Sequence, residues 1–377
     1  MNTATSTPPG LLFLATEIFA AGGIQRFNQT VLAAYARCHV ECRVLSLNDT
    51  PSSIAAGISH PNVTVSGFCG NRRRFALAVL RSLWSHRHEW LLVGHINFLL
   101  LAVICRLLMP FKRPAPILLF AHGIEVWSGI GRRRRYALLH TTKILCVSRY
   151  TRQRILDQVP SLQPARLSVF PNALAETWRS ARRTAAIRKL PGRFILSVTR
   201  IQRGDRYKGI VTVIEALSML ADDGIHYCVV GRGDDMPFLQ QVAARCGVGH
   251  RVHFMSDAKD AELIALYEQC DAFVLPSGKE GFGIVFLEAM YFGAPVIAAA
   301  MKGALDVVRD GETGLLVRFG DCVAVKDAIE RLSANPELRE LLRASGRATV
   351  ADGGPFTFSR FAERCSEVLG LSAVHAS

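Results

Sequence analysis

The chain has 377 residues, half of them hydrophobic and a fifth charged, a composition that excludes a disordered or fibrous protein. This length predicts two domains, since single domains commonly hold about 100 to 200 residues. The ten cysteines form no Cys-x-x-Cys pair, so zinc and small disulfide scaffolds are excluded and free thiols in a reducing compartment are expected.

Basic residues are concentrated in the first half of the chain. Residues 1–190 hold 25 basic and 7 acidic side chains, whereas residues 191–377 hold 20 and 24. Such a first half either faces an anionic partner or is a solvated surface. Phosphate headgroups, nucleic acid and nucleotide substrates are the candidate partners.

Short apolar runs alternate with amphipathic stretches through this first half. The run 11–15, the pair Gly22-Gly23 and the helical pattern after it predict a strand, a glycine turn and a helix. Further strands are predicted at 42–47, 90–93, 117–120 and 143–147. Strands that alternate with helices predict a doubly wound parallel sheet.

The sequence predicts no membrane-spanning helix and no secretory signal. Met1 to Gly10 carries no basic residue before its apolar stretch, and the most lipid-like segment, 98–109, has about half the length needed to cross a bilayer. The apolar segment 75–83, with Trp84 and basic neighbours, instead predicts an amphipathic surface helix.

A second series of elements follows an arginine-rich connector at 180–192. Strands are predicted at 194–198, 227–230, 252–254, 272–275 and 295–299, and helices at 210–220, 236–245, 261–269, 284–290 and 357–369. We therefore expect an α/β protein with two doubly wound Rossmann-like domains that face each other across a cleft. The expected domains are 1–185 and 186–354, with a C-terminal helix in about 355–377 packed back on the first domain.

Ligands of open parallel sheets bind beyond the carboxyl ends of the strands, so functional residues should lie just after strands. The stretch 276–290 meets this condition because it follows the strand predicted at 272–275. Gly281 and Gly283 let the backbone approach a ligand closely, and the helix that opens at Ile284 directs unpaired N–H groups toward it. A phosphate would suit that position.

Two carboxylates accompany this turn. Glu280 lies in the turn and could accept hydrogen bonds from hydroxyls, and Glu288 follows about two helical turns later. Such a pair suits a polyol better than a polyanion. Alternatively, both are surface acids beside an ordinary turn.

Basic residues follow the first strand of the second domain. Arg200 comes just after it and Lys208 opens the next helix, so both fall where a diphosphate would lie. Arg offers a fork for two oxygens and Lys a point charge. Arg203 and Arg206, within the insertion 202–207, are rivals for the same role.

His122 follows the strand at 117–120 and could exchange a proton or hydrogen-bond a sugar near neutral pH. Glu125, close by, could orient an acceptor. The turns at Gly22-Gly23 and Gly231-Arg232-Gly233 could bring backbone N–H groups to a nucleotide, although each alone is equally a plain turn.

Together these motifs resemble those of the retaining family 4 glycosyltransferases, or glycosyl transferases group 1, which have the GT-B architecture. Glu280 and Glu288 match the family's Glu-x7-Glu signature, and other family patterns follow in the expected order: Gly22-Gly23, His122-Gly123, Val147-Ser148, Pro171-Asn172, Arg200 with Lys208-Gly209, Gly231-x-Gly233 and Gly311 to Val317. The resemblance spans almost the full chain and is strongest after residue 194.

The resemblance implies that a hexose moves from GDP-mannose or a UDP-sugar to a glycan or lipid-linked acceptor in cell-surface polysaccharide biosynthesis. It also implies that domain 1–185 binds the acceptor and domain 186–354 binds the nucleotide sugar. It implies a front-face displacement in which the leaving diphosphate helps to deprotonate the acceptor. It assigns catalysis to His122, Arg200, Lys208 and Glu280, donor binding to Gly22, Gly23, Gly231, Gly233, Gly281, Phe282, Gly283, Ile284 and Glu288, and acceptor binding to Glu125.

No metal and no cofactor are expected. Metal-dependent transferases hold a divalent ion with Asp-x-Asp, which this sequence lacks. Side chains and helix ends must then receive the charge that builds on the departing diphosphate.

The basic runs of the first domain predict peripheral contact with an anionic membrane, at the cytoplasmic face of the plasma membrane. A nucleic-acid partner is not expected, because no helix-turn-helix, zinc finger or RNA motif accompanies these runs. Three alternatives remain: a nucleotide-sugar 2-epimerase of the same architecture, a nucleic-acid-binding protein and, with its glycine fingerprint incomplete, a nicotinamide dehydrogenase.

Overall fold

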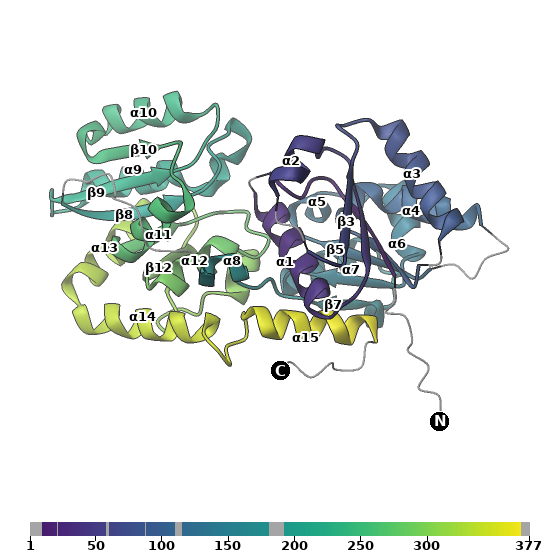
Figure 1. Cartoon of the computed structure of the whole chain (residues 1–377). Helices are drawn as coiled ribbons and strands as arrows, with labels where there is room; N and C mark the ends of the chain where they lie inside the picture. The colour runs from purple at the N-terminus through teal and green to yellow at the C-terminus, as the bar shows by residue number, and fades with distance from the viewer. Residues whose placement is uncertain are drawn as a thin grey trace. The chain divides into compact units, whose positions relative to one another are not determined.

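A computed structural model describes the chain except for residues 1–9, 21, 58–59, 87, 110–114, 181–191 and 371–377. The chain divides into two compact units, Met1–Ala175 with Phe358–Ser377, and Glu176–Thr357. Each unit is built on one parallel sheet with helices packed against it (Figure 1). The two Rossmann-like sheets confirm the predicted fold class.

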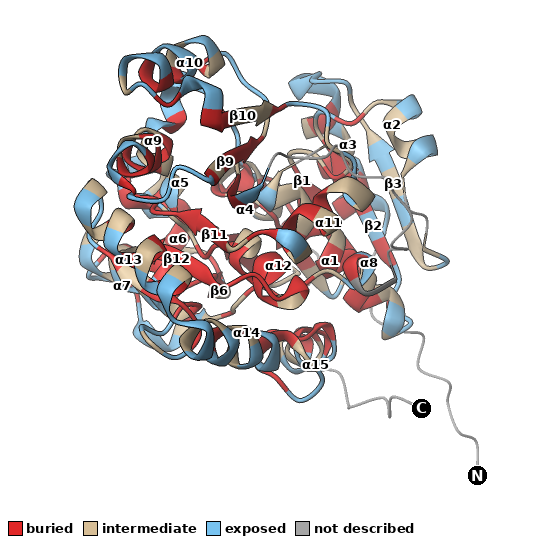
Figure 2. Cartoon of the chain, turned by 90° about the vertical axis from the view of Figure 1, so that its left-hand side faces the viewer, coloured by how far each residue is buried: buried red, intermediate tan, exposed pale blue. Residues whose placement is uncertain are grey.

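The sheet of unit 1 has seven strands in the order β3-β2-β1-β4-β5-β6-β7. Phe13 on β1 lies opposite Val44 on β2 and Leu92 on β4. The central strands are buried on both faces, as Figure 2 shows, which explains their unbroken apolar runs. The strands are β1 (Leu11–Ala15), β2 (Cys42–Ser46), β3 (Val63–Gly67), β4 (Trp90–Val93), β5 (Ile117–Ala121), β6 (Lys143–Cys146) and β7 (Leu167–Val169).

The helices of unit 1 include α15, the last helix that the structure describes, which packs against α1 (Figure 1). The Phe361 ring of α15 lies 5.8 Å from that of Phe27 and 5.0 Å from that of Phe170. The helices are α1 (Gly23–Arg37), α2 (Pro51–Ala56), α3 (Arg72–Ser85), η1 (Ile96–Phe98), α4 (Leu99–Leu107), α5 (Ile124–Trp127), α6 (Arg132–Leu139), α7 (Arg149–Gln158), η2 (Pro164–Arg166) and α15 (Phe358–Leu369). None of the described helices combines the length and the apolar character that crossing a bilayer requires.

The sheet of unit 2 has six strands in the order β10-β9-β8-β11-β12-β13. The strands are β8 (Arg193–Val198), β9 (Ile225–Val230), β10 (Val252–Met255), β11 (Ala272–Leu275), β12 (Val296–Ala299) and β13 (Leu315–Val317). The helices are α8 (Glu176–Ser180), η3 (Arg203–Lys208), α9 (Ile210–Met219), α10 (Met236–Arg245), η4 (Gly249–Arg251), α11 (Asp260–Gln269), α12 (Ile284–Phe292), η5 (Lys302–Asp306), α13 (Cys322–Ala334) and α14 (Pro336–Val350).

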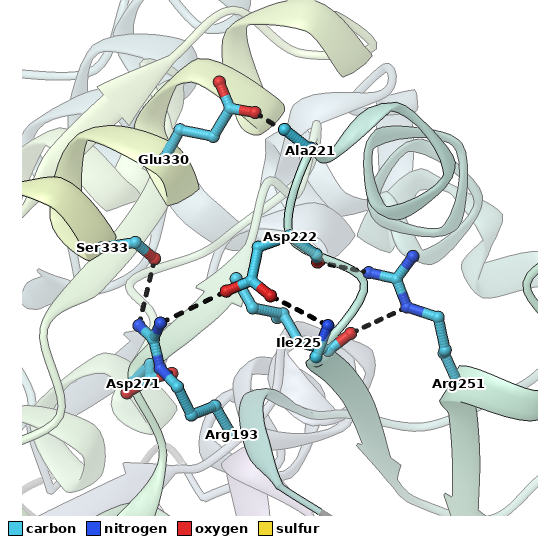
Figure 3. Close-up of polar contacts among 9 residues, drawn as sticks. Arg193, Ala221, Asp222, Ile225, Arg251, Asp271, Glu330 and Ser333 are labelled. Atoms are coloured by element: carbon cyan, nitrogen blue, oxygen red, sulfur yellow. Dashed lines mark hydrogen bonds and ion pairs between the residues drawn. The ribbon is translucent and has the colours of Figure 1, made fainter.

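Two arginines fasten the amino ends of the strands in unit 2 (Figure 3). Arg193 donates to Asp271 over 2.9 Å and to Asp222 over 3.4 Å. Arg251, which is 4% exposed, donates to the carbonyl of Ile225 over 3.0 Å. This network holds the end of the sheet opposite the carboxyl ends, so its role is structural.

Many arginines of unit 1 also hold the fold together, because they donate to backbone carbonyls at the ends of helices and strands. The recorded pairs are Arg106 with His140, Arg134 with Glu125, Arg135 with Gln158, Arg152 with Leu167, Arg154 with Trp127 and Arg166 with Leu139. The arginines of α3, by contrast, are exposed. The basic character of this unit therefore has both structural and surface components.

Candidate functional site

In unit 2 the carboxyl end of β11 leads into the turn that precedes α12. Gly283 is the N-cap of α12 and has a φ of 96°, and a side chain there would collide with the Phe286 ring. The backbone N–H of Gly303 donates to the carbonyl of Glu280 over 3.1 Å, which fixes the turn against the loop after β12. A glycine is thus required at the point where α12 opens.

Lys208 and Glu280 form an ion pair at this edge of the sheet. Lys208 Nζ lies 2.8 Å from Glu280 Oε2, and the two side chains are only 15% and 14% exposed. Gly209, with a φ of 79°, separates Lys208 from α9 and lies against the Pro276 carbonyl. The structure thus brings together two predicted site residues that are 72 positions apart in the chain.

Arg200 is exposed but anchored at its tip. Its Nη2 lies 3.3 Å from a carboxylate oxygen of Asp205, which is 8% exposed. The Tyr207 hydroxyl donates to the same carboxylate over 2.8 Å. Burial, and next this hydrogen bond, raise the pKa of Tyr207, so the phenol stays protonated. Asp205 therefore gathers two side chains of the loop after β8.

Arg206, one of the alternative candidates for diphosphate binding, has partners of its own. Its guanidinium donates to both oxygens of Asp235, over 2.8 and 2.7 Å, and lies 3.7 Å above the Phe238 ring. Arg206 is therefore engaged with α10. Arg203 is exposed, and its backbone N–H donates to Asp234 over 3.1 Å.

The glycine turn after β9 has a packing reason. A side chain at Gly231 would collide with the carbonyl of Thr199, and one at Gly233 with the carbonyl of Ile201. This turn therefore lies against the loop that carries Arg200, and only glycine allows the approach.

Two further predicted donor residues lie inside unit 2. Glu288 is 2% exposed and accepts a hydrogen bond from the buried hydroxyl of Tyr267 over 3.1 Å. Phe282 is 2% exposed and packs on Phe356. Gly281 and Ile284 are half-buried beside them. The carboxylate of Glu288 is thus less accessible than that of Glu280.

In unit 1, His122 lies at the carboxyl end of β5. Its Nε2 is 2.8 Å from the carbonyl oxygen of Gly94, and its backbone N–H donates to Glu125 Oε1 over 2.6 Å. Burial lowers the pKa of His122, and the nearby Glu125 only partly offsets this. A carbonyl can only accept, so the neutral ring carries its hydrogen on Nε2 and keeps Nδ1 as an acceptor.

Glu125 closes the turn after β5 and belongs to a polar cluster that the sequence analysis missed. Its carboxylate also accepts from the N–H of Gly123 over 3.2 Å. Arg134 donates to Asn97 over 2.7 Å and to the Glu125 carbonyl. Burial lowers the pKa of His95, which follows β4. Position just after a strand, the rule that selected His122, could have found His95 and Asn97.

The first helix of unit 1 opens with the predicted glycine pair. Gly22 is the N-cap of α1 and makes no side-chain cap, and a side chain at Gly23 would meet open space. Gly23 is exposed, but the side chain of Gln25 lies against Gly22, where an added side chain would collide with it. Within the described part of the chain, no three His, Cys, Asp or Glu side chains gather closely enough to hold a metal ion.

Two parallel Rossmann-like sheets with polar residues beyond the carboxyl ends of their strands are typical of the GT-B glycosyltransferases. The chain matches the family model for glycosyl transferases group 1 over residues 185–349 and that for glycosyltransferase family 4 over residues 21–176. The chain therefore belongs to the family 4, group 1 glycosyltransferases.

Two curated relatives of the chain are named as mannosyltransferases. The chain is 36% identical to a phosphatidyl-myo-inositol mannosyltransferase of Mycobacterium leprae over 146 residues, 38% of each chain. It thus spans well under half of that relative. It is also 32% identical over 251 residues to a GDP-mannose-dependent alpha-(1-6)-phosphatidylinositol monomannoside mannosyltransferase of Mycobacterium tuberculosis. This match covers 62% of the present chain and 64% of the relative.

Solved structures share the fold across nearly the whole chain. The crystal structure of Anabaena HepE in complex with UDP-glucose superposes with a TM-score of 0.76 and 17% identity, covering 96% of this chain and 99% of that one. At this identity the likeness concerns the fold alone.

Proposed function

We propose that the protein is a retaining, metal-independent glycosyltransferase that moves a hexose from a nucleoside diphosphate sugar to a glycan or lipid-linked acceptor. The observation that carries the proposal is the ion pair of Lys208 and Glu280, 2.8 Å long, at the carboxyl edge of the unit 2 sheet. A cation and a carboxylate side by side match the two chemically different parts of such a donor, a diphosphate and a polyol.

The departing diphosphate is the part that needs a positive charge. As the bond from the anomeric carbon to the phosphate oxygen breaks, charge builds on that oxygen, and prepositioned cations stabilise it. Lys208 would leave Glu280 for the diphosphate, and Arg200, held at its tip by Asp205, would add a second set of donors. The N-terminus of α12 would contribute its unpaired N–H groups.

Glu280 is assigned to sugar binding, because the hydroxyls of the sugar would replace Lys208 as its hydrogen-bonding partners once Lys208 turns to the diphosphate. Without an enzyme nucleophile, the acceptor oxygen attacks the face that the diphosphate leaves. The new bond joins the acceptor oxygen to the anomeric carbon, the bond to the phosphate breaks, and the acceptor proton passes to the leaving oxygen. Neutral His122 would accept a hydrogen bond from a sugar hydroxyl at Nδ1.

The donor is proposed to be GDP-mannose or a UDP-sugar. The Mycobacterium tuberculosis relative is named as GDP-mannose-dependent, and the Anabaena neighbour holds UDP-glucose. Two named relatives act on phosphatidylinositol compounds, which supports a lipid-linked acceptor. A role in cell-surface polysaccharide biosynthesis is part of the same proposal.

A cytoplasmic enzyme with a lipid-linked acceptor must reach the membrane surface. Arg72, Arg73, Arg74 and Arg81 are exposed on α3, where Leu77 and Trp84 are also exposed. Basic and apolar side chains on one surface helix favour peripheral contact with anionic lipids. We place this contact at the inner face of the plasma membrane.

Transfer from labelled UDP- and GDP-sugars in the presence of EDTA tests the proposal. Full activity is expected in EDTA, and Lys208→Ala and Glu280→Ala should each lower transfer about 100-fold or more, because each removes a group that binds the reacting donor. Lys326→Ala, which removes a half-buried lysine of α13 that is paired with Glu330, is the matched control.

Three outcomes would contradict this proposal. Activity that is lost in EDTA and returns with manganese would overturn metal independence. Transfer within threefold of wild type for both site variants would overturn the site. A donor epimer formed without any acceptor would identify a 2-epimerase instead.

A further inference from the structure

Unit 1 holds a groove whose lining includes none of the candidate site residues described above. It is a groove of about 810 Å³ between α3 and the edge of the sheet. Leu45 of β2 and Phe68, just after β3, contribute to its lining, together with α3. Among the described strands β3 lies at the edge of the sheet, and Ser66 near its carboxyl end is exposed.

The groove is strongly cationic. Three arginines line it, Arg43 from β2 and Arg74 and Arg81 from α3, and the lining includes no carboxylate. Arg43 Nη1 lies 3.4 Å from Nδ1 of His86, a further lining residue. Hydroxyls of Ser66 and Ser85 add neutral hydrogen-bonding groups. Guanidinium groups with hydroxyls among them are the usual partners of a phosphate.

The same helix also exposes apolar side chains. Leu77 is 53% exposed and Trp84 is 64% exposed. Since residues three, seven and ten positions apart share one side of a helix, Arg74, Leu77, Arg81 and Trp84 form a single stripe. The stripe thus presents positive charge and apolar surface together. The groove beside it likewise combines its arginines with apolar side chains, among them Leu45 and Phe68.

We propose that this groove binds the phosphodiester headgroup of an anionic glycerophospholipid, while Leu77 and Trp84 enter the boundary between headgroups and acyl chains. The proposal rests on the membrane contact proposed above and names its ligand and its site. A free phosphate would use the arginines but leave the apolar stripe in water, and RNA would gain little from Leu77. A lipid headgroup accounts for both features.

Cys69 can report whether the groove is occupied, because it lines the groove and is exposed. The other nine cysteines are buried or half-buried. The rate at which a thiol reagent modifies Cys69 is measured with and without dihexanoyl phosphatidylglycerol below its micelle concentration. Modification should slow at least fivefold. Dihexanoyl phosphatidylcholine and inorganic phosphate should each change the rate less than twofold, and Cys69→Ser gives the background.

A pair of double variants separates the groove from general electrostatic attraction. Arg74→Gln with Arg81→Gln removes two charges from the groove, and Arg132→Gln with Arg133→Gln removes two exposed charges from α6 in the same unit. On vesicles of equal parts phosphatidylglycerol and phosphatidylcholine, the groove variant should bind about tenfold more weakly or worse. The α6 variant should stay within threefold of wild type.

Equal losses for the two double variants, or no loss for either, would overturn the proposal. Protection of Cys69 by polyuridylate or inorganic phosphate, but not by the anionic lipid, would also overturn it. Donor binding is measured separately as the thermal shift produced by nucleotide sugars without lipid. If only the groove proposal is wrong, nucleotide sugars still produce this shift. If only the donor-site proposal is wrong, the shift is absent while vesicle binding is as expected.

Discussion

At the scale of single residues, the proposed donor site of unit 2 is electrically neutral because its two charged side chains pair with each other. Lys208 and Glu280 satisfy each other across 2.8 Å while both are largely buried. A diphosphate must compete with Glu280 for Lys208, and the hydroxyls of the sugar then restore a partner to Glu280. The two halves of the donor are therefore expected to bind with mutual assistance.

This competition predicts opposite effects of Glu280→Gln on binding and on transfer. The bare nucleoside diphosphate should bind a few-fold more tightly, because Lys208 no longer has a charged partner in the protein, whereas transfer should fall about 100-fold. Calorimetric titration and single-turnover transfer measure the two quantities. Glu312→Gln, which removes an exposed carboxylate paired with Arg309, is the control. Weaker nucleotide binding by Glu280→Gln would contradict the competition.

A half-buried histidine makes the stability of unit 1 depend on pH. Burial lowers the pKa of His88 to about 4, and its Nδ1 has no hydrogen-bond partner among the described residues. As the pH falls, the unfolded chain binds this proton first, so the contribution of His88 to stability should be complete above a pH of about 6.5 and should be lost progressively toward pH 4. Urea unfolding should show a shallower fall for His88→Gln, and an unchanged one for the exposed His250→Gln.

The sequence could name candidate groups at this scale but could not rank them. Arg200, Arg203 and Arg206 are equivalent basic residues after one strand, and their separation depends on distant partners. Asp235 and Phe238 occupy Arg206, and neither contact can be read from the local pattern. The sequence placed Glu288 correctly on a helix. It could not show that Glu288 accepts a hydrogen bond from the Tyr267 hydroxyl, because Tyr267 lies on another helix.

At the scale of elements, the insertion after β8 is an ordered turn. Residues Arg203–Lys208 form η3, whose Asp205 holds both Arg200 and Tyr207. The carbonyl of Tyr207 accepts from the N–H of Gly278 over 2.7 Å, which ties η3 to the loop after β11. The longer spacing between Arg200 and Lys208 thus supports the side chains at both of its ends.

Asp205 is therefore expected to act as a positioning residue. Asp205→Asn should raise the donor KM about tenfold, because a charge-assisted contact that orients Arg200 is lost, and should leave kcat within threefold. Steady-state kinetics measures KM and kcat separately, and Asp205→Glu should restore part of the donor affinity. Asp223→Asn removes an exposed carboxylate at the opposite end of the sheet and should be silent. An equal fall in kcat for Asp205→Asn would contradict a purely positioning role.

Apolar runs predicted the central strands of both sheets because those strands are buried on both faces. The sequence analysis missed β3 and β7, the edge strands of unit 1. Alternate residues of β3 are exposed, and β7 has only three residues, so neither produces a continuous apolar run. Helix α6 was also missed, since it opens with four arginines.

At the scale of the whole molecule, the fold class and the family were predictable, because a series of motifs in a fixed order carries more information than any single turn. The surface role of the basic first half was less so. Six of its arginines serve backbone carbonyls across 9 to 34 positions of the chain, contacts that composition cannot reveal. Those of α3 remain exposed, as do Arg132 and Arg133 of α6, so the basic surface of the first unit is confined to part of its arginines.

The chain completes the core of unit 1 only at its last described helix. Phe361 of α15 is fully buried against Phe27 of α1 and Phe170, although 182 residues of unit 2 lie between the two segments of unit 1. Truncation of this ring leaves a cavity, so Phe361→Ala should destabilise unit 1 by about 3 to 5 kcal/mol.

Hydrogen exchange read by mass spectrometry locates this effect in the chain. Amides of β1 and β5 should exchange faster in Phe361→Ala, whereas those of β8 and β11 should keep their wild-type rates, since unit 2 has its own core. Leu341→Ala, which shortens a side chain exposed on α14, should leave both units unchanged. Equal acceleration in the two units would show that they unfold together, and α15 would then stabilise the molecule as one cooperative body.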